Sequence, residues 1–181
     1  EGYPLEKRKC PIDGEKVKSC INCKRCSIMC GFGGAGAFSD GKYNITNQFG
    51  GTLHEYIGKR EAIDLMKYVD DINMSHGGEG TKLYSTANTE IKKTCLQNDL
   101  HLLDASVRHL GTDINYVVLE NLYNELKDKV EFHFMTPVET VAKSGDGYLV
   151  KTADAEYTCD KCIISAGRSG SKWMEGVCKD L

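Results

Sequence analysis

Residues 31–42 read GFGGAGAFSDGK, and five of these twelve residues are glycine. Such a run is too rich in glycine for the interior of a helix, because each glycine there costs about 1 kcal/mol relative to alanine. We therefore predict a closely packed loop at this point of the chain. Glycine carries no side chain, so the main chain of this loop can approach a bound ligand closely.

Upstream of this loop the sequence is dominated by cysteine. Five of the nine cysteines of the chain fall within a short segment: Cys10, Cys20, Cys23, Cys26 and Cys30. The spacing of the last four is that of the bacterial ferredoxin run, but that run has proline after its last cysteine. Here glycine follows Cys30, and the one Cys-Pro pair is Cys10-Pro11. A ligand set of Cys10, Cys20, Cys23 and Cys26 is therefore as well founded as the contiguous set.

Several uses of these five thiols stay open. Four thiolates could hold an iron–sulfur cluster or a tetrahedral zinc ion, and two could form a redox disulfide. The thiols could also bind nothing. Lys18, Lys24 and Arg25 lie nearby and would stabilise thiolates. The odd number of cysteines argues against a disulfide scaffold of a small secreted protein, so we expect a cytoplasmic protein.

Downstream of the glycine loop the pattern is first helical. We predict a helix over 52–74 with a break at Gly58, a short helix over 89–98 and an extended segment over 100–107. The clearest helix is predicted over 113–129, where apolar residues recur every four positions and Thr112 is the expected N-cap.

From residue 130 the period changes to that of strands. Strands are predicted over 130–135, 156–159 and 161–165, and a hairpin joins 137–143 to 148–152 through Ser-Gly-Asp-Gly. The order of elements predicts an α/β protein, of the α+β kind within this chain. We divide it into a Cys- and Gly-rich segment (1–50), a mainly helical segment (51–129) and a β-meander (130–181).

Composition excludes several classes of protein. The 181 residues include 23 Lys and Arg against 26 Asp and Glu, a net charge of −3. A chain so close to neutral has no strong electrostatic attraction to nucleic acid or to an acidic membrane surface. No apolar stretch is long enough for a membrane-spanning helix.

Three stretches carry a resemblance to a known family: Gly33–Lys42 (GGAGAFSDGK), Val107–Asp113 (VRHLGTD) and Cys162–Gly170 (CIISAGRSG). Together they resemble a large bacterial family of FAD-dependent dehydrogenases within the glutathione-reductase-like flavoprotein superfamily. The resemblance implies part of a Rossmann-like FAD domain joined to a substrate domain with a β-meander and amphipathic helices. It also implies hydride transfer between a small-molecule substrate and flavin, with NAD(P)H as a possible electron partner.

One part of the family pattern is missing from this sequence. Family members open with a strand, a G-x-G-x-x-G turn and a helix that holds the FAD pyrophosphate. Here Glu1 stands where the acidic ribose ligand that follows that unit is expected. We therefore expect an internal piece of the protein, whose partners are the remaining N- and C-terminal parts of the FAD domain. Residues 1–181 alone are expected to bind FAD weakly or not at all and to be inactive.

The resemblance also assigns residues to the cofactor. In the glycine loop, bare N–H groups and the Ser39 hydroxyl would bond anionic oxygens, and Lys42 would balance phosphate charge. Val138 would lie against the adenine, and Ala166-Gly167 would lie beside the dinucleotide. The full set is Glu1, Gly33, Gly34, Ala35, Gly36, Ser39, Asp40, Gly41, Lys42, Val138, Ala166 and Gly167. The alternatives are a purely structural loop and a plain meander.

Arg108 and His109 are the candidate catalytic residues. They precede a predicted helix N-terminus, which attracts anions, and histidine exchanges a proton near neutral pH. His109 would remove a substrate proton while hydride goes to flavin, and Arg108 would anchor a substrate carboxylate. The alternative is a structural histidine beside an arginine that is exposed at the surface or ion-paired. The remaining histidines show no pairing in the sequence.

Two functions from different classes thus stand side by side. The first is an FAD-dependent oxidoreductase. The second is a non-enzymatic structural module that binds zinc or an iron–sulfur cluster through Cys10–Cys30.

Overall fold

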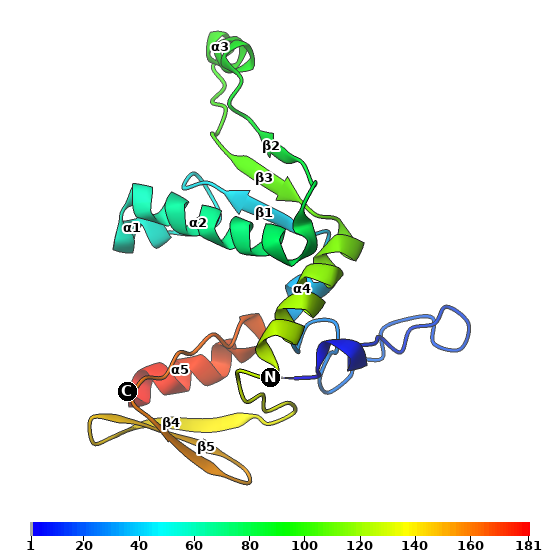
Figure 1. Cartoon of the computed structure of the whole chain (residues 1–181), viewed down its shortest axis with the longest axis vertical. Coiled ribbons are helices and arrows are strands. Elements are labelled where there is room, and N and C mark those ends of the chain that lie inside the picture. The colour runs from blue at the N-terminus through cyan, green and yellow to red at the C-terminus, as the bar shows by residue number, and fades with distance from the viewer. Residues whose placement is uncertain (1) are drawn as a thin grey trace. The chain divides into compact units, whose positions relative to one another are not determined.

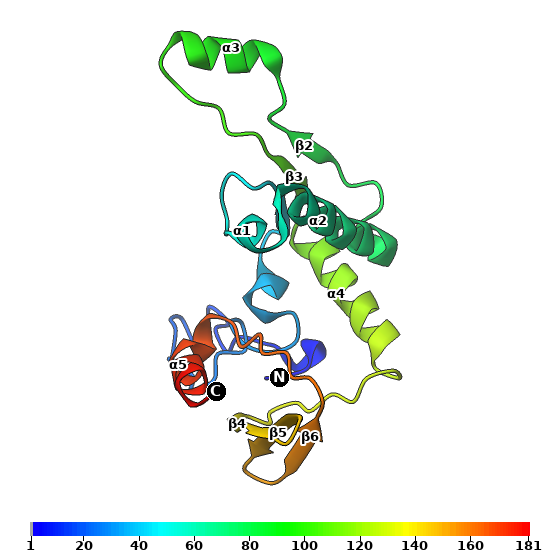
Figure 2. The same ribbon diagram turned by 90° about the vertical axis from the view of Figure 1, so that its left-hand side faces the viewer.

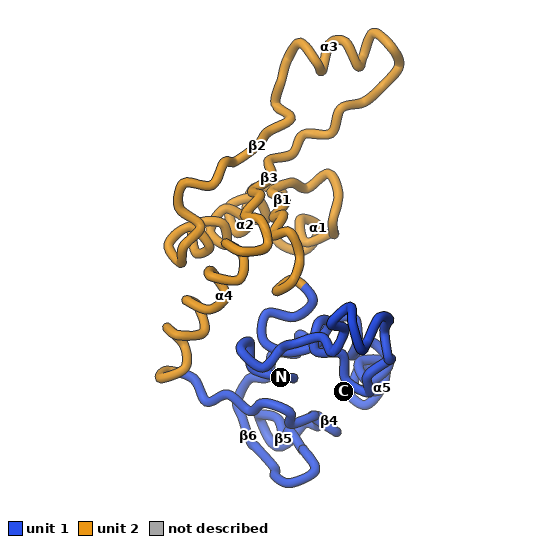
Figure 3. Tube along the Cα trace, turned by 90° about the vertical axis from the view of Figure 1, so that its right-hand side faces the viewer, with its two compact units in different colours: residues 1–35, 130–181 blue, residues 36–129 orange. Residues whose placement is uncertain are grey.

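The computed structural model describes residues 2–181, which divide into two compact units (Figure 3). Unit 1 comprises residues 1–35 and 130–181, and unit 2 comprises residues 36–129. Glu1, the expected ribose ligand, lies outside the described residues.

Unit 2 combines a small antiparallel sheet with helices (Figure 1). The strands pair in the order β1-β3-β2, so β3 is central. Helix α3 lies within the connection between β2 and β3, at the tip that is farthest from the sheet and away from α1 and α2 (Figure 2). The bounds are β1 Lys42–Ile45, α1 Leu53–Ile57, α2 Lys59–Asn73, β2 Leu83–Ser85, α3 Thr89–Gln97, β3 Ser106–His109 and α4 Thr112–Leu126, with a π-helical turn at Met74–Gly78.

Local signals explain where several of these helices begin and end. The predicted break at Gly58 is confirmed: its φ of 94° separates α1 from α2. Helix α3 begins after Asn88, whose side chain accepts hydrogen bonds from the N–H groups of Glu90 and Ile91. The predicted cap of α4 is wrong, because Gly111 is the N-cap and Thr112 is already helical.

Unit 1 contains the predicted β-meander and a C-terminal helix. Strands β4 (Val138–Ser144), β5 (Gly147–Thr152) and β6 (Glu156–Cys159) pair in consecutive antiparallel order. Helix α5 (Ser171–Asp180) contacts β4, where the indole N–H of Trp173 donates to the Glu139 carbonyl at 2.9 Å. The N-terminal segment contains a 3-10 turn at Leu5–Lys7. An isolated parallel β-bridge pairs Tyr3 with Gly31.

Two predicted strands are absent from the described residues. Residues 130–135 form no strand, because Met135 adopts a left-handed φ of 56° and Phe132 packs against the rings of Phe32 and Phe134 instead. Residues 161–165 also pair with no strand, and Ile163 is 93% exposed. Alternation of apolar and polar residues predicts a strand only where a partner strand is at hand.

The α+β part of the predicted fold class is confirmed by the five α-helices and two small antiparallel sheets of residues 2–181. The Rossmann-like FAD domain stays a prediction, because both of these sheets are antiparallel. Within the same residues, every helix is too short or too polar to cross a membrane.

Candidate functional site

The glycine loop runs across the boundary between the units, with Gly33, Gly34 and Ala35 in unit 1 and the rest of the loop in unit 2. A 3-10 turn spans Gly34–Phe38. The main chain from Gly33 to Gly36 is exposed. A Cβ atom on Gly36 would meet no atom within 4 Å, and Gly36 has no left-handed φ, so neither packing nor backbone conformation in the described chain requires glycine there.

The second half of the loop is closed on itself. The Ser39 hydroxyl donates to the Gly36 carbonyl at 2.8 Å and accepts from the Gly41 N–H at 3.2 Å. The fully buried Asn115 of α4 also donates to the Gly36 carbonyl, at 2.8 Å. Ser39, predicted to bond a cofactor oxygen, is therefore engaged in holding the loop.

Gly41 and the neighbouring main chain join the loop to the segment after β3. The N–H groups of Leu110 and Gly111 donate to the carbonyls of Gly41 and Asp40, each at 3.0 Å. Gly41 is buried at a φ of 62°, and a Cβ there would lie 3.0 Å from the Cβ atoms of Asn115 and Leu110. The structure thus brings together two of the three stretches that carry the family resemblance.

A small charged group forms where β1 meets β3. Lys42 pairs with His109 in the sheet register, and its ammonium contacts the Asp40 carboxylate at 2.6 Å. The hydrogen bond from Lys42 lowers the pKa of Asp40, and the charges of Lys42 and His109 act in the same direction. His109 is exposed, so the predicted proton acceptor is open to small molecules.

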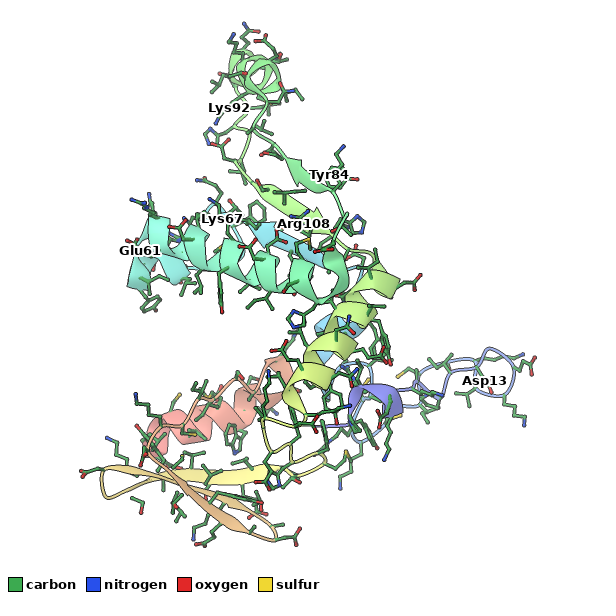
Figure 4. The ribbon with its side chains drawn as sticks, in the orientation of Figure 1. Asp13, Glu61, Lys67, Tyr84, Lys92 and Arg108 are labelled. Atoms are coloured by element: carbon green, nitrogen blue, oxygen red, sulfur yellow. The ribbon has the colours of Figure 1, made fainter. Side chains whose placement is uncertain are left out.

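Arg108, labelled in Figure 4, was predicted to anchor a substrate carboxylate, but its guanidinium binds groups of the protein itself. Its Nε and Nη2 donate to both carboxylate oxygens of Asp70, at 3.0 and 2.7 Å, and its Nη1 donates to the Thr81 carbonyl at 2.6 Å. The side chains of Arg108 and Asp70 are 12% and 8% exposed. Asp70 raises the pKa of Arg108 by hydrogen bonding to the guanidinium. This arginine ties β3 to α2 and thereby positions its neighbour His109.

The remaining predicted cofactor residues lie in unit 1. Ala166 and Gly167 line an open cavity of about 730 Å³ together with Ile164 and residues of α5. Gly167 has a φ of 66° and marks the turn before α5. Val138 is the first residue of β4, directly before a bulge in the pairing with β5, and does not line this cavity.

Four of the five clustered cysteines line a second cavity, of about 220 Å³. Its thiols are those of Cys10, Cys20, Cys23 and Cys26. Cys30 is not part of this lining, and its sulfur lies 3.6 Å from the Ser169 hydroxyl. Among residues 2–181, no three metal-ligating side chains lie close enough together to hold a single metal ion.

Three side-chain pairs in the structure were not expected from the sequence. Asp70 is the buried partner of Arg108. His76 pairs with Glu125 at 2.8 Å, a partner that no pattern in the sequence indicated. The third is the pair Cys159 and Cys162, in which burial, followed by the effect of Cys159, raises the pKa of Cys162. Its C-x-x-C spacing is visible in the sequence and was the available signal.

Comparison of the chain with protein-family models, curated proteins and solved structures gave no match.

Proposed function

We propose that this chain forms the flavin-proximal and substrate-binding part of an FAD-dependent oxidoreductase. The observation that carries the proposal is the open cavity of about 730 Å³ at Ala166-Gly167, two residues expected to lie beside the dinucleotide. Small-molecule and cofactor sites commonly have volumes of roughly 300–1,000 Å³. The small side chains at the turn and the apolar Ile164 and Met174 would admit a flat, partly apolar group.

The exposed Gly33–Gly36 main chain supports the same assignment. Within the described chain, neither packing nor backbone conformation requires glycine at position 36. A ligand that lies close against the main chain would require it, because a side chain would then be in the way. The N–H groups of a glycine-rich turn suit the anionic oxygens of a pyrophosphate. The run passes from unit 1 to unit 2 after Ala35, whereas the cavity lies within unit 1, so each is proposed as a cofactor contact on its own evidence.

When bound, FAD would supply the hydride acceptor or donor. The chain's own contribution to the chemistry is proton handling at His109, whose imidazole would accept the proton that a substrate loses. Arg108 holds the strand that carries His109 through its ion pair with Asp70. Lys42 and Asp40 lie beside this position and would orient a polar substrate group.

The segment Cys162–Ser165 supports a larger sheet. It pairs with no strand of residues 2–181, and its apolar residue Ile163 is 93% exposed. We propose that this segment pairs with strands of a Rossmann-like FAD domain, which the resemblance assigns to flanking sequence. A nicotinamide cofactor is proposed as the partner that exchanges electrons with the flavin.

The test is FAD content of the gene product that carries this sequence, purified at its natural length. The protein is denatured, and the released flavin is identified and quantified by chromatography. We expect FAD in a ratio of about one per chain, and about tenfold weaker FAD binding for Gly36→Ala, equivalent to about 1.4 kcal/mol. Gly176→Ala is the matched control, because a Cβ there also meets no atom within 4 Å. Absence of flavin, together with failure to bind added FAD, would overturn the proposal.

A further inference from the structure

The four cysteines that share the 220 Å³ cavity come from two stretches of one loop. Cys10 lies in the incoming stretch, and Cys20, Cys23 and Cys26 lie in the returning stretch. The cavity lining contains no histidine and no carboxylate, so its only strong metal-ligating groups are thiols. An all-thiolate set selects soft metal centres, namely zinc or iron–sulfur clusters.

Hydrogen bonds join the start of the loop, at residues 8 and 9, to its end, at residues 27 and 28. The buried Arg8 donates to the carbonyls of Ser27 and Ile28 at 2.8 and 2.6 Å. The Ser27 hydroxyl donates to the Lys9 carbonyl at 2.5 Å. Cys10 follows Lys9 and Cys26 precedes Ser27, so these hydrogen bonds join the two stretches directly beside Cys10 and Cys26.

The far end of the loop is a separate turn. The Asp13 carboxylate accepts hydrogen bonds from the N–H groups of Glu15, Lys16 and Val17, at 3.0, 2.8 and 2.9 Å (Figure 4). With both ends stabilised locally, the stretches between them can move toward a bound centre without unfolding the rest of unit 1. Metal binding commonly completes the folding of such cysteine loops.

The segment around the thiols is rich in basic residues. Between Lys7 and Cys26 there are seven Lys or Arg residues and two acidic residues. The Asn22 N–H contacts the Cys20 sulfur at 3.4 Å, from a backbone held at a left-handed φ of 52°. Hydrogen bonds to ligating sulfurs are a recurring feature of iron–sulfur sites.

We infer that Cys10, Cys20, Cys23 and Cys26 are the ligands of a four-iron, four-sulfide cluster. The C-x2-C-x2-C run plus a remote Cys-Pro is the ferredoxin ligand pattern, with the remote cysteine upstream in this chain. Zinc sites typically take their cysteines from C-x2-4-C pairs. This chain offers a C-x2-C-x2-C triplet instead, which is the run that iron–sulfur clusters use. The triplet and Cys10 line one cavity, so the ligand pattern favours a cluster over a single ion.

Cys30 is excluded from the ligand set by its position outside the cavity, beside Ser169. This choice separates the two ligand sets that the sequence left open.

The experiment is anaerobic reconstitution of the 181-residue chain with sulfide and equal amounts of ferrous and ferric iron, which supply both oxidation states of the cluster, followed by removal of unbound ions. We expect about four iron and four acid-labile sulfide per chain, and a broad visible absorption that bleaches on reduction. Cys10→Ser and Cys23→Ser should each lower the bound iron severalfold. Cys30→Ser and Cys95→Ser are the matched controls and should retain the iron content of the unaltered chain.

Three results would overturn the inference. The first is loss of the cluster in Cys30→Ser with retention in Cys10→Ser, which would restore the contiguous ligand set. The second is tight binding of one zinc ion per chain in a parallel zinc titration, with no iron and sulfide retained. The third is no retained metal in either titration. Iron and sulfide content is measured independently of flavin, so failure here leaves the FAD proposal to its own test.

Discussion

In unit 2 the least exposed charged side chains are paired with each other, whereas in unit 1 the buried Arg8 donates to main-chain carbonyls. Arg108 binds both oxygens of Asp70 within unit 2. Arg8 instead reaches the carbonyls of Ser27, Ile28 and Phe32. The ion pairs found in unit 1, such as Lys151 with Glu156, lie on exposed side chains.

The difference indicates which conditions each unit should resist. A pair of ionised side chains depends on both charges, so substitution of one partner leaves the other charge buried and unpaired. Main-chain carbonyls carry no titratable proton. The fastening of the cysteine loop by Arg8 should therefore change little with pH, whereas unit 2 should respond to both substitution and pH.

The largest expected effect is that of Asp70→Ala, which leaves the Arg108 guanidinium without its carboxylate. We expect unit 2 to lose about 3–5 kcal/mol in free energy of unfolding. Circular dichroism in urea follows both units, whereas the fluorescence of Trp173, the single tryptophan, follows unit 1. The dichroism transition should shift to lower urea while the fluorescence transition stays in place.

Glu90→Ala is the control for this substitution, because it removes the exposed pair with Lys93. Exposed pairs contribute about 0–1 kcal/mol, so its transition should nearly coincide with that of the unaltered chain. Equal effects of Asp70→Ala and Glu90→Ala would contradict the structural role of the Arg108 pair.

The second effect, in unit 1, is that of Arg8→Met. Buried carbonyls that lose their donor cost about 1–3 kcal/mol, so the fluorescence transition should move to lower urea. Arg8→Lys should recover only part of the loss, because a compact ammonium cannot span three separate carbonyls as the guanidinium fork does. Trypsin should also cut faster at Lys16 and Lys18. Full recovery by lysine would show that charge, rather than the geometry of the fork, holds the loop.

Local sequence signals account for much of the fold. The break at Gly58, the helix after Asn88 and the hairpin before Gly147 each depend on residues close in sequence, so they were predictable. The strands predicted over 130–135 and 161–165 do not form, because a strand depends on residues that are distant in sequence. A strand needs a partner, and the alternation of side chains within one segment does not supply it.

The candidate sites likewise include one that local sequence spacing indicates and one that depends on residues distant in sequence. The spacing of the five clustered cysteines left two ligand sets open, and the structure places Cys10, Cys20, Cys23 and Cys26, but not Cys30, around one cavity. The Asp70–Arg108 pair joins residues 38 positions apart, and no local pattern marks it. This pair changes the interpretation of Arg108 from a substrate anchor to a residue that positions β3.

A smaller, pH-dependent effect is expected at His76 in unit 2. Both ring nitrogens face acceptors: Nδ1 lies 2.7 Å from the Ile72 carbonyl and Nε2 lies 2.8 Å from Glu125. Both nitrogens can donate only in the imidazolium, so the pKa of His76 is raised, first by Ile72 and then by Glu125. His76 also lowers the pKa of Glu125.

The sign of this effect follows from linkage. A raised histidine pKa stabilises the fold fully below the unfolded value of about 6.5, and this contribution is lost as pH rises through the folded value. The thermal midpoint of the unaltered chain should therefore exceed that of His76→Asn at pH 6, and the gap should narrow toward pH 9. The Glu125 contribution is lost at the acid end, as pH falls through its lowered pKa. A gap that is constant across this range would contradict the pairing. His101→Asn is the matched control.

The smallest expected effect concerns Cys159 and Cys162 in unit 1. Here burial shifts a pKa, whereas in unit 2 hydrogen bonds and charges shift the pKa of His76. Burial raises the pKa of Cys162, and the charge and hydrogen bond of Cys159 raise it further. Only the thiolate reacts with iodoacetamide, so Cys162 should be alkylated severalfold more slowly at pH 8 than the exposed Cys178. Brief labelling followed by mass spectrometry of the peptides measures both rates in one sample. Cys159→Ser should accelerate Cys162 only partly, because burial, the larger cause, remains. Labelling of Cys162 as fast as Cys178 would contradict this prediction. It would show that burial does not raise the pKa of the Cys162 thiol.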